Sequence, residues 1–261
     1  MTGATPSAPG PPSAFAAAIL PAILAPAAVL LARASSGPVL LPILATLAIY
    51  PVLALLVVRR RRRAAAIATL LWAASLSVSV IGLTARRPEA MEPIVFNGAD
   101  YRDEMFGFIR SGHGREGDPS RFLPQHVLHL AAFCLLAWLS AGLLGIALGA
   151  VLVAYMSFYV GSLAAAGAAP ALAFAIGWPP WAILRVVAFV LLGVTLAEPL
   201  LLAAMRRMRS TATGTPNRPA RPEGRLDPWY LTAAALLLAD VVLKYLMAPG
   251  WAALLRRCLQ P

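Results

Sequence analysis

Charged residues are scarce in this sequence: they make up 13% of its 261 residues, whereas 60% of the residues are hydrophobic. A soluble domain cannot hide so much apolar surface, because its exterior must be polar enough to stay dispersed. The apolar residues form long continuous runs rather than alternating with polar ones, which favours helices over the strands of a barrel. The sequence therefore predicts an all-α integral membrane protein, a polytopic bundle of about seven transmembrane helices.

Lysine and cysteine are almost absent. Lys244 is the single lysine, and Cys134 and Cys258 are the two cysteines. No CxxC pair exists, so cysteine provides no zinc or disulfide framework, and we interpret both residues as inert thiols. The sequence also lacks GxSxG, Walker, HExxH and paired intramembrane aspartate motifs, so it does not indicate a known catalytic class.

Acidic residues are half as frequent as basic ones, which gives a formal charge of +11. Such a charge can indicate nucleic-acid binding, but here the arginines lie at the ends of apolar runs, as cytoplasmic membrane anchors do. The run 59–63 contains five consecutive arginines. We therefore expect no nucleic-acid partner, and instead contacts with a lipid bilayer that contains anionic lipids.

The N-terminal third contains three apolar runs. Residues 1–13 are small, polar and proline-rich, which predicts disorder. Helices are expected over 14–32, 39–58 and 64–84, with the arginine run at 59–63 forming a tight cytoplasmic turn. The first run could be a signal peptide, because residues 32–34 resemble a small-x-small cleavage site; six helices would then remain after cleavage. Because no positive residue precedes the run, we expect it to be retained and the N-terminus to be cytoplasmic.

An extracytoplasmic loop is expected over 85–123, where seven of the eleven acidic residues lie. Within it, residues 100–110 form an amphipathic pattern, with Tyr101, Met105 and Phe108 on one face. A glycine-rich stretch and a proline follow, which indicates a flexible loop of the kind that serves as a lid or docking surface.

A transmembrane hairpin is expected over 124–167, with a turn near 140–145; one long helix is the alternative. Ala141, Gly145 and Gly149 recur at intervals of four, which favours close helix packing. Tyr155 and Tyr159 form a polar stripe further along, interpreted as interhelical hydrogen bonding or, alternatively, a substrate path.

The C-terminal third continues with a Trp/Pro linker and sixth helix over 168–205, in which tryptophans serve as interfacial anchors. A basic cytoplasmic loop is expected over 206–228. The segment 229–261 contains the last helix, which Pro249 and Gly250 should end, and an amphipathic tail at the outer surface.

Five ionisable residues on three helices are expected to meet in the outer third of the membrane: His126, His129, Arg185, Asp240 and Lys244. Charges within the membrane are costly, about 2.5–3.5 kcal/mol each, so each needs a partner or a function. The simplest alternatives are that Asp240 and Lys244 neutralise one another along one helix face and that Arg185 extends to the headgroups. Glu198 is a secondary candidate, which either pairs with cytoplasmic arginines or binds a proton or cation.

His126 and His129 share a helix face and could supply half of a metal site, completed by Asp240 or by loop residues such as Asp100 or Glu104. No other cofactor is expected. Two functions are consistent with these features. The first is a non-enzymatic bacterial inner-membrane protein, acting in transport or as an accessory to other membrane subunits. The alternative is an outward-facing intramembrane enzyme, metal-dependent or lipid-modifying, that uses the same five residues.

Overall fold

The computed structural model describes residues 14–34, 37–167, 169–213 and 227–259. Within these ranges every regular element is a helix and no strand is present. The segment 1–13, expected to be disordered, and residues 214–226 of the basic loop lie outside the described residues.

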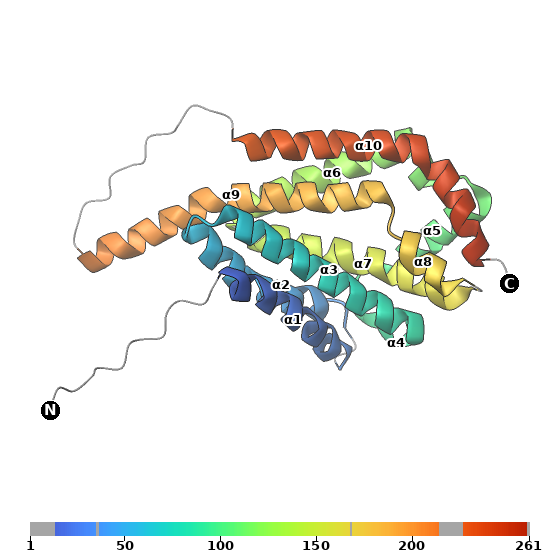
Figure 1. Cartoon of the computed structure of the whole chain (residues 1–261), viewed down its shortest axis with the longest axis horizontal. Coiled ribbons are helices and arrows are strands. Elements are labelled where there is room, and N and C mark those ends of the chain that lie inside the picture. Colours follow the sequence, from blue (N-terminus) through green and yellow to red (C-terminus); the bar gives the residue numbers. More distant parts are fainter. Residues whose placement is uncertain (1–13, 35–36, 168, 214–226, 260–261) are drawn as a thin grey trace.

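Ten α-helices, joined by three short 3₁₀ turns, make up the described part of the chain (Figure 1). The helices are α1 (Ala14–Arg33), α2 (Leu40–Val58), α3 (Arg62–Arg86), α4 (Pro88–Met91), α5 (Gly98–Ser111), α6 (Pro119–Leu139), α7 (Leu143–Ala166), α8 (Pro170–Ile176), α9 (Pro180–Thr213) and α10 (Pro228–Leu255). The 3₁₀ turns are η1 (Glu92–Ile94), η2 (Arg115–Gly117) and η3 (Arg256–Leu259).

Six of these helical stretches are long and apolar enough to cross a membrane: α2, α3, α6, α7, α9 and the continuous stretch Pro228–Leu259. This confirms the predicted all-α membrane bundle. The corresponding part of α1, Ile19–Arg33, is shorter than a span, so the total of seven helices stays a prediction.

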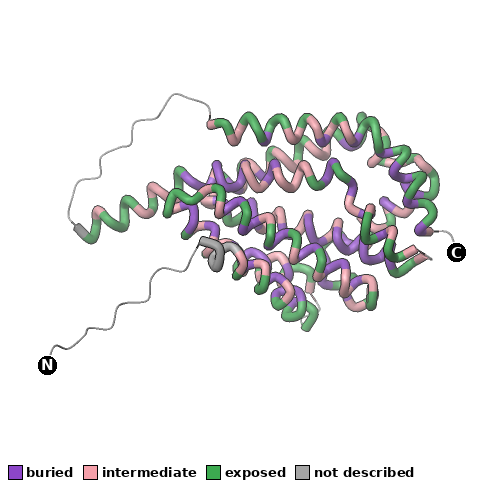
Figure 2. Tube along the Cα trace, viewed as in Figure 1, coloured by how far each residue is buried: buried purple, intermediate pink, exposed green. Residues whose placement is uncertain are grey.

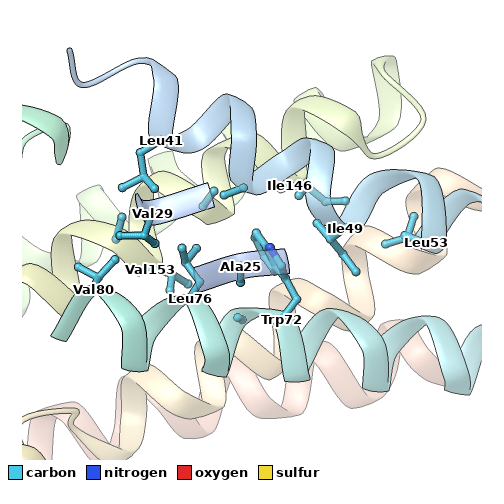
Figure 3. Close-up of a cluster of buried hydrophobic side chains, with 14 of the residues drawn as sticks. Ala25, Val29, Leu41, Ile49, Leu53, Trp72, Leu76, Val80, Ile146 and Val153 are labelled. Carbon is cyan, nitrogen blue, oxygen red and sulfur yellow. The ribbon is translucent and has the colours of Figure 1, made fainter. Parts of the chain in front are cut away.

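The largest buried cluster lies where α1, α2, α3 and α7 meet (Figure 3). Val29, Ile49, Leu76 and Val153 are almost completely buried there, beside the indole of Trp72. By contrast, α10 packs at the periphery and leaves much of its apolar surface exposed (Figure 2). Because Leu231, Leu238 and Leu246 are each at least 60% exposed, this surface is suited to contact with lipid.

Two tight turns set the packing of the helical hairpins. Arg60 has a left-handed backbone (φ 61°), and the N–H of Arg61 bonds back to the carbonyl of Leu56, which is a Schellman ending of α2. The same ending closes α6: Ala141 is left-handed (φ 53°), and the N–H of Gly142 bonds to the carbonyl of Ala137. The stretch 119–166 is therefore two antiparallel helices, not one long helix.

Small residues allow close helix contacts, although not at every predicted position. A Cβ atom on Gly145 would lie 2.7 Å from that of Ala137, so α6 and α7 meet closely there. A Cβ on Gly149 would meet nothing within 4 Å, so this residue makes no such contact. The helices α3 and α7 also approach closely at Gly161, where a Cβ would lie 2.5 Å from Cβ of Thr84.

Several predicted helix ends were wrong. Pro249 lies inside α10, which continues to Leu255, because Trp251, Ala252 and Leu255 bury their side chains in a second cluster with α5, α7 and α8. A proline removes one backbone hydrogen bond, and this packing compensates for the loss. The C-terminal tail is amphipathic: Trp251, Ala252 and Leu255 are buried, whereas Arg256 and Arg257 are exposed.

Other differences have similar local causes. The α6 helix starts at Pro119, earlier than expected, because Asp118 caps it by accepting a hydrogen bond from the N–H of Ser120. Trp181 is not an interfacial anchor: it is 1% exposed and packs edge-on against Trp251. The α9 helix extends to Thr213, about 50 Å in all, which exceeds the hydrocarbon thickness of about 30 Å.

The bundle has two chemically different ends. We call the end formed by the α2–α3 turn, the α6–α7 turn and the start of α10 the arginine end. We call the opposite end, formed by α4, α5, η2 and the C-terminal part of α10, the loop end (Figure 1).

Candidate functional site

The buried centre of the loop end is an ion pair between α9 and α10. Nε and Nη2 of Arg185 each donate a hydrogen bond of 2.8 Å to one carboxylate oxygen of Asp240. Asp240 is 1% exposed, so its carboxylate has no contact with the exterior, and the guanidinium of Arg185 compensates its negative charge. The alternative in which Arg185 extends to the headgroups is wrong, because its guanidinium is engaged at Asp240.

Lys244 lies one turn further along α10 and has a different partner. Its ammonium nitrogen is 2.7 Å from Oε2 of Glu116, which η2 brings in from the loop, and 4.4 Å from the ring centre of Phe122. Lys244 is fully buried. The expected neutralisation of Asp240 by Lys244 is therefore wrong: both residues face the bundle, but each forms an ion pair with a separate element.

The two histidines of α6 lie beside this ion pair. Nε2 of His126 is 3.9 Å from Oδ2 of Asp240, and both of its ring nitrogens are buried without a hydrogen-bond partner. An unsatisfied buried polar group costs about 1–3 kcal/mol, so these nitrogens are notable positions for a ligand contact. Of the five predicted residues, the structure brings His126, Arg185 and Asp240 into direct proximity.

An intramembrane pocket starts at these groups and extends along the bundle between α2, α3, α6, α7 and α9. The pocket is narrow: the centres of water-sized molecules can occupy about 80 Å³ of it. His126, His129, Arg185 and Tyr155 line it at the loop end, whereas Phe133, Ile146, Gly149, Val190 and Val194 line it elsewhere. The pocket therefore has a polar end and an apolar length.

The predicted polar stripe of α7 divides between two environments. Tyr155 lines the intramembrane pocket and its ring lies 4.6 Å from that of Tyr101 on α5. Tyr159, 1% exposed, packs edge-on against Tyr101 and Phe106 in the second buried cluster. Its hydroxyl has no hydrogen-bond partner, so the interhelical hydrogen bond expected for Tyr159 is absent among the described residues.

Glu198, the secondary candidate, lies at the other end of the bundle. Its Oε1 accepts a hydrogen bond of 2.8 Å from Arg60, and its Oε2 forms an ion pair with Arg62. Arg62 also pairs with Asp227, the N-cap of α10. Glu198 thus joins α9 to the α2–α3 turn, as the simpler of its two interpretations expected.

No group of three or more His, Cys, Asp or Glu side chains suited to a metal ion occurs among the described residues. His126 approaches Asp240, but Glu104 is engaged elsewhere: its Oε1 lies 3.2 Å from Nε of Arg115. Metal binding by His126 and His129 therefore stays a prediction, and the function proposed below does not use a metal.

The loop above the site contains a second cluster of charges. Burial raises the pKa of Glu104, and nearby Glu116 raises it further, against the opposing effects of Arg115 and Lys244. On the exposed face of α5, Arg102 forms ion pairs with Asp103 and Glu92, and its hydrogen bond lowers the pKa of Asp103. Glu116, through its ion pair with Lys244, attaches this loop to α10.

Three contributors to the site were not singled out from the sequence: Glu116, Phe122 and Tyr101. Glu116 lies in a glycine-rich loop without periodicity, so only the density of acidic residues pointed to it. Tyr101 was assigned to the apolar face of α5, but its contact with Tyr155 depends on how α5 docks.

Models of known protein families, curated proteins and solved structures were compared with this chain, and none matches it. Its function is therefore argued from the geometry of the site.

Proposed function

We propose that this protein binds an amphipathic, lipid-like molecule in the intramembrane pocket, and that it acts without catalysis as a transport component or as an accessory subunit of a membrane complex. The observation that carries the proposal is the polarity of the pocket. His126, His129, Tyr155 and Arg185 line one end of it, and apolar side chains line most of the remainder.

The length of the pocket suits an apolar chain. The α9 residues that line it extend from Ala182 to Val194, a separation of about 18 Å along the helix axis. This is more than half of a hydrocarbon core of about 30 Å. Because ligand sites combine an apolar lining with a few orienting polar groups, an amphipathic molecule is the best match.

The polar end favours recognition by hydrogen bonding over recognition by net charge. Arg185 and Asp240 neutralise each other through two hydrogen bonds, which leaves Nη1 of Arg185 without a described partner. The ring nitrogens of His126 are also unpartnered. We therefore expect a headgroup with hydroxyl, ester or amide groups rather than a compact anion.

The two glycines Gly149 and Gly82 provide a matched test. Both are helical, and a Cβ added to either meets nothing within 4 Å, but only Gly149 lines the intramembrane pocket. In proteoliposomes, a diacylglycerol with a diazirine in its acyl chain should label pocket residues such as Val153, Met156 and Val190. Gly149→Leu should reduce that labelling at least fivefold and Gly82→Leu should not; labelling confined to outward residues such as Leu238 would refute the proposal.

A lipid-modifying enzyme is the second candidate, favoured by the unpartnered His126 beside Asp240. In that function His126 would act as a general base, oriented by the carboxylate of Asp240. Wild-type protein would then convert a radiolabelled phospholipid, and His126→Gln would stop the conversion while photolabelling of the pocket remained. An absence of product with wild-type protein would favour the non-catalytic function.

We also propose a bacterial inner membrane with the arginine end in the cytoplasm. This orientation is supported by the positive charges of 59–63 and of Arg206, Arg207 and Arg209 near the end of α9. In intact cells, an impermeant maleimide should label Ser111→Cys at the loop end and should label Thr211→Cys only after permeabilisation. Labelling of both positions in intact cells would contradict this orientation.

A further inference from the structure

The arginine end contains a pocket that is separate from the intramembrane pocket. Arg60, Arg61, Arg62, Arg63, Ala64 and Trp229 line it, where the α2–α3 turn faces the start of α10. We call it the arginine pocket. Two acids, Glu198 and Asp227, hold Arg60 and Arg62 in fixed positions beside it.

The remaining arginines of the turn are free. Arg61 and Arg63 are exposed, and their side chains form no hydrogen bond or ion pair with any described residue. Five arginines at 59–63 face two acids, so the turn retains about three positive charges. The arginine pocket therefore presents preorganised guanidinium groups with unused donors, which is the chemistry that recognises phosphate.

The surroundings of the arginine pocket indicate where that phosphate comes from. Ile67 on α3 is 54% exposed and lies three residues after Ala64 of the pocket, so the two residues share a helix face about one turn apart. Trp229 lines part of the arginine pocket, and tryptophan side chains are enriched at the level of the lipid headgroups. A free phosphate would use only the arginines, whereas a phospholipid would also cover these apolar side chains.

We propose that the arginine pocket binds the phosphate of an anionic glycerophospholipid, whose acyl chains lie along Ile67. The phosphate of the bound lipid neutralises positive charge of the turn that Glu198 and Asp227 do not neutralise. By contacting both elements, the lipid also holds the α2–α3 turn against α10. This site is independent of the function proposed above, because the two pockets have no residue in common.

The test measures binding of phosphatidylglycerol to the detergent-solubilised full chain by native mass spectrometry, with phosphatidylcholine as the zwitterionic comparison. Arg61→Gln/Arg63→Gln removes two free arginines of the pocket. Its matched control is Arg206→Gln/Arg207→Gln, which removes the same charge from exposed positions on α9 outside the pocket. Gly149→Leu tests independence from the intramembrane pocket.

We expect the double variant of the pocket to bind phosphatidylglycerol about 25-fold more weakly, since each arginine near a membrane surface contributes about fivefold. The α9 control and Gly149→Leu should bind as the wild type does, and phosphatidylcholine should bind weakly to all. Equal losses in both double variants would mean that total charge alone matters, and would overturn the proposal. Displacement of the lipid by millimolar inorganic phosphate would overturn the assignment to a lipid.

Discussion

The two ends of the bundle each bury a carboxylate that is compensated by arginine, but in different ways. At the arginine end, Glu198 faces Arg60 and Arg62, whose side chains are 68% and 33% exposed. At the loop end, Asp240 faces Arg185, and fully buried Lys244 faces Glu116. The arginine end therefore keeps an excess of charge that reaches the surface, whereas the loop end matches each buried charge with one partner.

This difference predicts where charge removal is most costly. A buried charge left without its partner cannot regain water, whereas a side chain that reaches the surface can. The loop end should therefore depend strictly on each ion pair, and the arginine end should tolerate the loss of one.

The largest effect is expected for Asp240→Asn. The variant leaves the guanidinium of Arg185 buried without its anion, which should lower the free energy of unfolding by about 3–5 kcal/mol. Thermal unfolding in detergent measures the change. A double variant, Arg185→Met/Asp240→Leu, should recover much of the loss, because it removes both charges; if the double variant were as unstable as the single one, the ion-pair explanation would fail.

Glu116→Gln should have a smaller effect, about 1–3 kcal/mol, because buried Lys244 can release its proton when its partner is lost. The change should be local. Hydrogen exchange should increase over η2 and the preceding glycine-rich residues, while that of α3 stays constant. Asp103→Asn, which removes an exposed acid from α5, is the control and should change stability by less than about 1 kcal/mol.

Glu198→Gln should lower stability by about 1.5 kcal/mol, the contribution of a hydrogen bond to a charged group. Arg60 and Arg62 can then turn toward the surface or toward Asp227. An effect as large as that of Asp240→Asn, measured in the same thermal unfolding assay, would remove the proposed difference between the two ends.

The smallest effect concerns pH. Because burial raises the pKa of Glu104 above its ordinary value of 4.5, the folded protein holds this proton more tightly than the unfolded chain does. Stability is therefore lost as the pH rises from 4.5 through the folded pKa. Glu104→Gln should be more stable than wild type at pH 7, and this advantage should vanish at pH 4; an advantage that is equal at both pH values would contradict the assignment.

Much of the fold follows from the apolar runs, since helices of this length are the simplest way to satisfy a backbone in lipid. The expected limits of α2 and α3 lie within two residues of those observed. Pro249 was misread, because a local rule for ending helices was outweighed by the packing of Trp251 and Leu255.

The candidate site was only partly predictable. The depth of Arg185, Asp240 and Lys244 follows from counting residues along each helix, but their partners depend on helix rotation, which spacing on one helix does not specify. The i, i+4 spacing of Asp240 and Lys244 favoured mutual neutralisation. In the structure each residue instead pairs with a residue of another element, Asp240 with Arg185 and Lys244 with Glu116. The intramembrane pocket involves five helices and has no signature in any one of them.

The central claim is that an amphipathic molecule lies in the intramembrane pocket with its polar group at the loop end. Two diacylglycerol probes test it directly, one with a diazirine near the headgroup and one with a diazirine at the chain terminus. We predict that the first labels residues near Tyr155 and Trp178 and the second labels residues near Ile146 and Val194; Ile146 lies about 14 Å from Tyr155 along α7. Identical labelling by both probes, or labelling outside the pocket alone, would contradict the claim.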